Sequence, residues 1–259
     1  MQGMTDETAN SYVGLTAATA YARLLLSDER MKRVSVFRYR SPPSLQNRIE
    51  LSKSERALID RALNFRAETR LPFWTSLFAI CLRSGECAPQ LVEAAFFHNG
   101  PGEPVLFDRN SVETGVLEGL VQSGTANVSL SSEVQGVDGC VRHLSLLDFH
   151  CETSPDNEAL AALICAQLMP GGYLLIDSGD SYHACGLELL TAHERIYFLG
   201  KALLTAPIVD AHYIAHQLQQ DVSTIRISKG GKATHEPLVV RAWVPSACPT
   251  KGTEVIGIC

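Results

Sequence analysis

The chain has 259 residues, of which 46% are hydrophobic and 19% are charged, and its formal net charge is −6. This balance is typical of a globular protein with one large core or two smaller ones, and the negative charge argues against a surface that binds nucleic acid all over. The longest apolar runs, such as residues 173–176, are far shorter than the roughly 20 residues of a membrane span. The polar, acidic start lacks the features of a secretory signal, so we expect a soluble, cytoplasmic protein with no membrane partner.

The first half of the sequence mixes helical and strand-like patterns. Apolar residues recur at helical spacing over residues 12–32. The segment from Ser52 to Glu55 is a capping box, which predicts a helix to about Ala67 because each end side chain can satisfy the other's free backbone N–H. The other expected elements are a helix over residues 72–82, a strand over 91–97, a helix over 111–122 and a strand over 128–134.

Basic residues gather within residues 28–56, where eight of them stand against four acidic ones. The basic residues are Arg30, Lys32, Arg33, Arg38, Arg40, Arg48, Lys53 and Arg56. One interpretation is a solvated face of helices and loops. The other is a track for the phosphate backbone of a nucleic acid.

The second half has clearer boundaries. An apolar strand over residues 144–151 precedes a helix that begins with Ser154 as N-cap and Pro155 at its first position. A hairpin follows, with strands over 173–177 and 181–187, and a capping box from Thr191 to Glu194 starts another helix. The remaining expected elements are an extended segment at 208–210, a helix over 212–219 and strands over 224–228 and 238–244.

The order of strand, helix, hairpin, helix and further strands in this half suits a sheet with helices packed mainly on one face. For the whole chain we expect an α/β (α+β) fold with a mixed sheet. We divide the chain into an N-terminal α/β module with a basic helical segment, residues 1–140, and a second unit, residues 141–259. The two are expected to form one compact body.

Three strand ends carry candidate functional residues. In the first, alternation along the strand puts Asp148, His150 and Glu152 on one face. A carboxylate with an imidazole two residues later is a reasonable half-site for a divalent ion. The alternative is that these residues only end a strand at the surface.

The second strand end is the hairpin turn from Asp177 to His183. A glycine-containing turn brings backbone N–H groups close to a ligand, and Ser178, Ser181 and His183 can donate to phosphate oxygens. A histidine on a strand is also often structural, so both interpretations stand.

The third strand end combines Asp210, which ends an apolar run, with the strand that holds Arg226. Lys229 and Lys232 flank a flexible glycine pair after it. Together these residues offer one carboxylate for a metal and several cations for a triphosphate. The alternative for Arg226 is an ion pair within the sheet.

The order of these segments is more specific than any one of them. It resembles the three motifs of the archaeo-eukaryotic primase-polymerase superfamily, which are an apolar run with Asp-x-Asp or Asp-x-Glu, a hairpin with Ser-x-His and an apolar run ending in Asp. An Arg-bearing strand commonly follows in that superfamily. The resemblance covers about residues 144–244 and implies an RRM-like catalytic half, with the N-terminal half as one side of a nucleic-acid cleft.

The resemblance also implies a function, which is metal-dependent transfer from nucleoside triphosphates to a 3′-hydroxyl of DNA or RNA, with Mg²⁺ or Mn²⁺, as in DNA replication or repair. Carried over by position, the catalytic and metal-binding residues would be Asp148, His150 and Asp210. The nucleotide-binding residues would be Ser178, Ser181, His183 and Arg226.

One position departs from the superfamily pattern, because His150 stands where the first motif has its second acid. Imidazole binds Mn²⁺ or Zn²⁺ but brings no negative charge and suits Mg²⁺ poorly. Either His150 or Glu152 completes an altered site, or the site binds a nucleotide with one metal or none.

Three functions therefore compete. The first is a nucleotidyltransferase, and the second is a catalytically impaired primase-like module that binds nucleotide or nucleic acid. The third is an unrelated hydrolase with a metal centre built from Asp148, His150, His183 and Asp210. It ranks last, because the chain has no HExxH or GxSxG motif.

Overall fold

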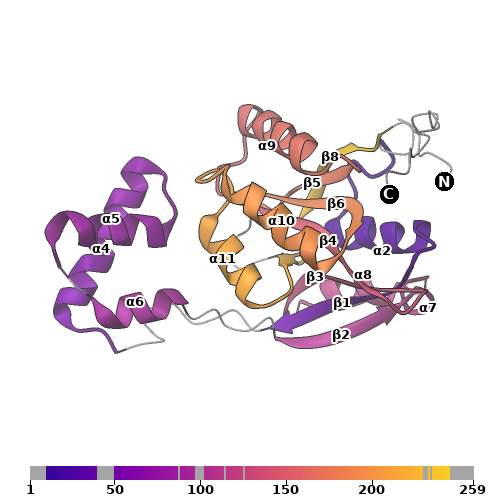
Figure 1. Ribbon diagram of the computed structural model, residues 1–259, viewed down its shortest axis with the longest axis horizontal. Helices are drawn as coiled ribbons and strands as arrows, with labels where there is room; N and C mark the ends of the chain where they lie inside the picture. Colours follow the sequence, from indigo (N-terminus) through magenta and orange to yellow (C-terminus); the bar gives the residue numbers. More distant parts are fainter. Residues whose placement is uncertain are drawn as a thin grey trace, which may run out of the picture.

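The structure is a computed structural model that describes residues 10–39, 50–86, 88–96, 102–113, 115–124, 126–229, 233 and 235–245. Figure 1 shows a central sheet with helices packed around it and a separate group of helices at one side. Arg40, Arg48 and Lys232 of the predicted basic segments lie outside the described residues. None of the described helices is long and apolar enough to cross a membrane.

One eight-stranded sheet forms the centre of the molecule, in the order β2-β1-β3-β4-β6-β5-β8, with β7 paired to β3. The strands are β1 (Met31–Tyr39), β2 (Glu103–Asp108), β3 (Asn127–Gly136), β4 (Val141–Asp148), β5 (Tyr173–Asp177), β6 (Tyr182–Leu190), β7 (Thr224–Arg226) and β8 (Leu238–Trp243). The α/β class is confirmed. The sequence predicts a mixed sheet, whereas the described strands pair only antiparallel.

Helices cover both faces of the whole sheet, while the helices of the second half, for which one face was expected, do pack together on one face. On one face pack α2 (Ala17–Ser27), α7 (Arg109–Glu113) and α8 (Val116–Gln122), and on the other α9 (Pro155–Leu168), α10 (Ala192–Leu203) and α11 (Ala211–Gln219). The central strands feed both cores by alternation: Leu146 and Leu174 belong to the first core, and Leu147 and Leu175 to the second. Residues 144–147 and 173–176 are largely apolar because both faces of these strands are buried.

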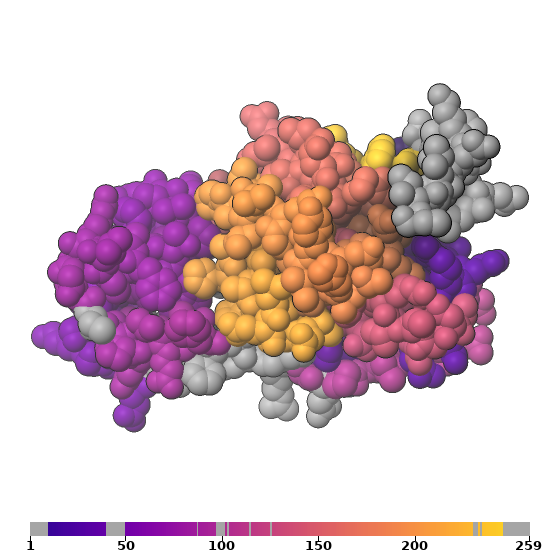
Figure 2. All heavy atoms as spheres, viewed as in Figure 1, coloured from indigo at the N-terminus to yellow at the C-terminus, as the bar shows by residue number. Residues whose placement is uncertain are grey.

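A helical lobe is inserted between β1 and β2. It consists of α4 (Lys53–Thr69), α5 (Phe73–Ser84) and α6 (Pro89–Phe96) and has its own small core around Leu58 and Leu77. The lobe stands beside the C-terminal half of the molecule (Figures 1 and 2). Contacts to that half come from Arg70 at the end of α4, which pairs with Glu152, and from Trp74 and Phe78 of α5, which stack near His212. The capping box at Ser52 is confirmed, because Ser52 Oγ accepts from the Glu55 backbone N–H and the Glu55 carboxylate accepts from the Ser52 backbone N–H.

Several elements differ from those expected in the first half. The segment predicted as a strand at 91–97 lies largely in α6, because Pro89 opens a helix and the alanines of this segment are good helix formers. The helix expected over 12–32 ends at Ser27, and β1 begins at Met31. Gly115, with a φ of 72°, separates α7 from α8.

The sheet is continuous across the predicted domain division near residue 140. β3 and β4, on either side of that point, pair antiparallel between Glu133–Gln135 and Val141–His143. The division into two domains stays a prediction. What the structure adds is that the strands on both sides of residue 140 contribute to the same sheet and to the same buried core.

Candidate functional site

The three predicted motif segments lie side by side at one end of the central strands. Asp148 ends β4 and is directly opposite His183 on β6. The segment before α11 runs along the end of β4, since the backbone N–H of Asp210 donates to the carbonyl of Asp148 at 3.2 Å and Phe149 bridges to Val209. Antiparallel pairing thus joins the first motif to the second, and this short bridge joins it to the third.

The fourth segment, β7, enters the site where β3 and β4 separate. β3 pairs with β4 only near Glu133–Gln135, and further along it pairs with β7, with Ser129 opposite Arg226. The short strand β7 therefore fills the space between β3 and the C-terminal end of β4, which carries Asp148. This insertion brings Arg226 to the same place as Asp148 and His183.

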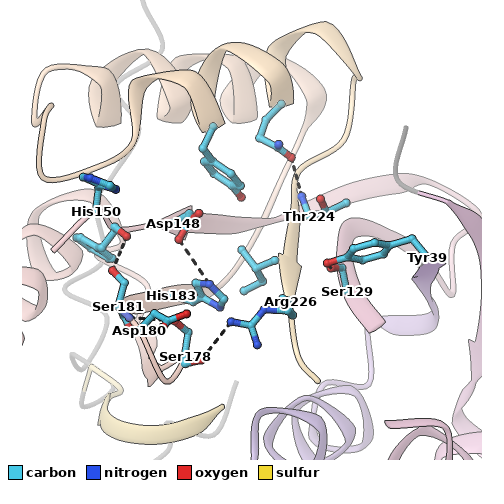
Figure 3. A pocket seen from close by; sticks show the side chains of 14 residues that line it. Tyr39, Ser129, Asp148, His150, Ser178, Asp180, Ser181, His183, Thr224 and Arg226 are labelled. Atoms are coloured by element: carbon cyan, nitrogen blue, oxygen red, sulfur yellow. Dashed lines mark hydrogen bonds and ion pairs between the residues drawn. The ribbon is translucent and has the colours of Figure 1, made fainter. Parts of the chain in front are cut away.

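A cavity of about 380 Å³ opens between these segments. Figure 3 shows the Asp148 carboxylate pointing toward the His183 ring, with Arg226 beyond the ring and near Ser178. The cavity lining combines predicted and unpredicted residues. They are Tyr39, Ser129, Asp148, Phe149, His150, Ser178, Asp180, Ser181, His183, Tyr213, Gln217, Thr224, Ile225 and Arg226.

Asp148 is held in a setting that disfavours its negative charge. Burial, with a further contribution from the charge of Asp210, raises the pKa of Asp148 to about 7, while Arg226 opposes the shift. The side chain keeps 36% of its surface exposed toward the cavity, so solvent partly screens this effect. A bound cation relieves such an arrangement, in which a neighbouring negative charge disfavours the ionised form of a carboxyl group.

His183 is a neutral imidazole at physiological pH. Burial, together with the positive charge of Arg226, lowers its pKa to about 3. Its Nε2 lies 3.5 Å from Oδ1 of Asp148, so the two groups contact as a carboxyl and a neutral ring rather than as an ion pair. A neutral ring can donate one hydrogen bond to a phosphate or carboxylate oxygen without adding charge to the site.

Asp210 has two roles in this geometry. Its Oδ1 caps α11 by accepting from the backbone N–H groups of His212 at 2.8 Å and Tyr213 at 3.4 Å. Its charge also acts on Asp148 across the bridge between the two segments. Capping fixes the position of the carboxylate and leaves the second oxygen for another partner.

His150 also lines the cavity, but its ring lies apart from the contact between Asp148 and His183 (Figure 3). The pKa of His150 is lowered, mainly by burial and also by the charge of Arg66 on α4. Asp210 and the backbone groups of Arg70 and Leu71 oppose this shift without reversing it. These influences place His150 at the boundary between the sheet and the helical lobe. Glu152, the other candidate for an altered metal site, pairs instead with Arg70.

The serines of the hairpin turn are engaged in holding the turn. Ser181 Oγ donates to the carbonyl of Phe149 and accepts from Cys151 N–H at 3.3 Å, which ties the turn to the end of β4. Ser178 Oγ donates to the carbonyl of Ser181 at 3.0 Å. Gly179 has a φ of 93°, and a Cβ there would lie 2.8 Å from Cβ of Ala233, so this turn requires glycine.

The guanidinium of Arg226 is held by backbone carbonyl groups rather than by a carboxylate. Its guanidinium donates to the carbonyl of Ser228 at 2.6 Å and to the carbonyl of Ser178 at 3.2 Å. In the described part of the chain it takes part in no ion pair. The positive charge therefore faces the site and acts on Asp148 from beyond ion-pair distance.

The sequence-based reasoning missed several lining residues that come from distant elements. Tyr213 and Gln217 share one face of α11, four residues apart, and Gln217 Oε1 accepts from the Thr224 N–H at 2.7 Å. The buried hydroxyl of Tyr213 has no hydrogen-bond partner among the described residues, and burial and the charge of Asp148 raise its pKa well above the usual value. Only the spacing of Tyr213 and Gln217 is a signal in the sequence.

The donor set can be compared with the needs of a divalent ion. Within the described ranges, no group of three or more histidine, cysteine, aspartate or glutamate side chains is arranged to hold a metal. Mg²⁺ in nucleotide sites is commonly held by one or two protein carboxylates together with substrate phosphates and water. The neighbouring carboxylates of Asp148 and Asp210 fit that more modest requirement.

Comparison with known proteins agrees with this geometry. Residues 112–238 match a protein family described as AEP-like, archaeo-eukaryotic primase 1D-like. No curated protein and no solved structure gives a match. The matched region contains every strand and helix that brings Asp148, His183, Asp210 and Arg226 together. Over residues 112–238 this chain is a member of the archaeo-eukaryotic primase-like family.

Proposed function

We propose that this protein is a primase-polymerase-type nucleotidyltransferase, which transfers a nucleotidyl group from a nucleoside triphosphate to a nucleic-acid 3′-hydroxyl. The observation that carries the proposal is the convergence of Asp148, His183 and Arg226 around one cavity, with Asp210 beside Asp148 although it does not itself line the cavity. Neighbouring carboxylates beside a half-buried cation are suited to phosphoryl transfer, where catalysis depends on positioning and on charge neutralisation.

Asp148 and Asp210 would hold Mg²⁺ or Mn²⁺, with His150 as an additional nitrogen ligand for Mn²⁺. Such an ion supplies charge neutralisation on the transferring phosphate and activation of the attacking hydroxyl. Because the pKa of Asp148 is about 7, its carboxyl must give up a proton for the site to take a cation at neutral pH.

The protein groups have separate tasks in this proposal. The guanidinium of Arg226, which is free of carboxylates in the described structure, would bind triphosphate oxygens. The neutral ring of His183 would donate to a phosphate oxygen without repelling a metal. Tyr213 lines the same cavity, and a ligand group that reaches its buried, unpartnered hydroxyl would satisfy its hydrogen bond.

The two serines would act mainly through the shape of the turn. The hydroxyl proton of Ser181 is already donated to Phe149, and that of Ser178 to the carbonyl of Ser181. Their contribution to nucleotide binding is thus to hold backbone groups of the turn beside the cavity.

The second candidate is a module that binds nucleotide or nucleic acid without transferring nucleotidyl groups. It is favoured by His150, which removes one negative charge from the position where the superfamily has an acid. Nucleotide binding through Arg226 and His183 does not require that acid, whereas charge balance for two divalent ions does.

Primer extension with Mg²⁺ and with Mn²⁺ tests the proposal. We expect the wild-type chain to extend a primer and Asp148→Asn to lose about 100-fold or more of the rate, since metal charge stabilisation is worth several kcal/mol. Asp138→Asn is the matched control, because Asp138 lies at the opposite end of β4, in the turn after β3, and pairs with Arg142.

Nucleotide binding without extension by the wild-type chain would favour the second candidate. Equal activity of wild type and Asp148→Asn would contradict the proposed role of this carboxylate.

A further inference from the structure

A second cavity of about 560 Å³ adjoins the first and lies between α4 and the functional end of the sheet. The two cavities share His150, Asp180 and Ser181. On the lobe side the second cavity is lined by Leu63, Arg66, Ala67 and Arg70, all from α4 or its C-terminal end. Figure 2 shows this lobe packed beside the C-terminal half of the molecule.

Three arginines follow one face of α4. Arg56, Leu63 and Arg70 are spaced by seven residues, and Arg66 and Ala67 fall between the last two on the same side of the helix. The arginines are exposed, and the face from Arg56 to Arg70 is about 21 Å long at 1.5 Å per residue. We call these three side chains the arginine face. The arginine face extends from the first turn of α4 to the C-terminal end of this helix, which lines the second cavity.

The arginine face holds little of its charge in internal pairs. Of the described residues, Arg56 and Arg66 take part in no ion pair, and Arg56 donates only to the carbonyl of Leu51. Arg70 pairs with Glu152 across the cavity, with 73% and 70% of the two side chains exposed. A pair this exposed is weak, so a phosphate can replace Glu152 at small cost.

We propose that the arginine face binds the phosphate groups of a single-stranded nucleic acid and directs the strand toward Asp148, with Glu152 holding Arg70 while the strand is absent. Charge complementarity along the face supports a phosphodiester chain, because a single triphosphate would not need a row of arginines of this length. Leu63 and Ala67 give apolar contact for bases between the cations. The proposal deepens the proposed function and rests on it, because the strand is the substrate that the site at Asp148 would extend.

Equilibrium binding of a fluorescently labelled single-stranded oligonucleotide to the full chain tests this, measured by anisotropy without divalent ions or nucleotide. We expect Arg66→Ala with Arg70→Ala to weaken binding about tenfold or more and to reduce the slope of log affinity against log salt by about 1.4, at roughly 0.7 per lost phosphate contact. Glu152→Gln releases Arg70 and is expected to tighten binding about two- to fivefold.

The chain offers a matched control on the same helix. Arg61 of α4 pairs with Glu86, also with both side chains exposed, but neither lines the cavity. Arg61→Ala and Glu86→Gln should therefore leave oligonucleotide affinity unchanged. The opposite effects expected of Glu152→Gln and the double arginine variant also separate binding from misfolding, which can only weaken it.

Three results would overturn the inference: no oligonucleotide binding by the wild-type chain, wild-type affinity in the double variant, or a loss confined to binding of labelled ATP. The last result would assign the arginines to the nucleotide instead of the strand. Asp148→Asn should retain strand binding in the absence of metal. Strand binding through the arginines without any extension would therefore refute the proposed function and leave this inference intact.

Discussion

The end of the sheet and the helical lobe hold their charged groups in opposite ways. At the sheet, Arg226 is fixed by two backbone carbonyls, and the turn that carries Ser178 and Ser181 is closed by hydrogen bonds to its own backbone and to β4. On α4 the arginines are exposed and contact few described partners. The difference teaches that the sheet provides fixed geometry suited to chemistry, whereas the lobe provides adaptable charge suited to a flexible ligand.

The two regions also differ in what keeps them folded. The sheet buries a core on each of its faces, while the described core of the lobe consists of Leu51, Leu58, Ile59, Ala62, Leu77, Ala88 and Leu91, with a few half-buried neighbours. Stability scales with the apolar surface removed from water, so we expect the lobe to open before the sheet does.

The largest expected effect follows from the small core of the lobe. Leu77 is fully buried, and Leu77→Ala should cost about 2–5 kcal/mol, which is enough to unfold the lobe locally. Hydrogen exchange should show lost protection in α4 and α5 with protection of β4 and β6 retained. Leu82→Ala, at an 86% exposed position on α5, is the control and should change neither. Cooperative loss of protection in the whole chain would refute the independence of the two regions.

The next effect concerns the fixed charge at the sheet. Arg226→Gln should weaken binding of a nucleoside triphosphate about 10- to 100-fold, since a hydrogen bond to a charged group contributes roughly 1.5–3 kcal/mol. Titration with a labelled nucleotide measures this. Arg241→Gln, on β8 and paired with Glu158, should bind normally. Equal losses in the two variants would show that general surface charge, rather than the site, governs binding.

A smaller effect is expected at Ser181, where the structure and the motif interpretation differ. Ser181→Ala removes the link between the turn and the backbone at Phe149 and Cys151, so it should lower the free energy of unfolding by about 1–2 kcal/mol. Urea unfolding measures the change, and Ser84→Ala, at an exposed position of α5, is the control. Unchanged stability with a large loss of nucleotide affinity would support a direct phosphate contact instead.

The smallest effect is the pH dependence that Asp148 adds to stability. Its pKa is raised from 3.8 to about 7 in the folded chain, so the folded state binds this proton more tightly and stability falls as pH rises between these values. Solvent at the cavity screens the penalty. Asp148→Asn should therefore be slightly more stable than wild type at pH 8 and should lose this advantage at pH 4.5, as measured by chemical unfolding. An advantage independent of pH would show that the carboxyl charge is not its cause.

Much of the site could be predicted because its signals are local. The Asp148, His183 and Asp210 motifs follow one another in the order of the superfamily, and each ends or begins a well-marked element. The capping boxes at Ser52 and Thr191 and the N-cap at Ser154 were all identified correctly. Each is a contact within four residues, which the chain encodes without help from the rest of the fold.

The strands of the first half were harder to predict. β1 carries Lys32, Arg33 and Arg38 among its apolar residues, so its strand pattern was hidden within a basic segment. The short apolar run at 91–97 suits a helix or a strand, and its position in the lobe decides for α6. Tyr39 and Ser129 reach the cavity only because β1 and β3 pair beside β7.

The sequence by itself determined the α/β class, the helix starts at Ser52, Ser154 and Thr191, and the order of the acidic, Ser-x-His and arginine segments. Only the tertiary structure decided that Ser178 and Ser181 close a turn, that Tyr213 faces Asp148, and that Arg66 and Arg70 stand across a cavity from His150. The physical reason is the sequence separation of the interacting residues. Caps and turns are set by neighbours in the chain, whereas burial, charge coupling and cavities arise where strands and helices from distant parts of the sequence pack together.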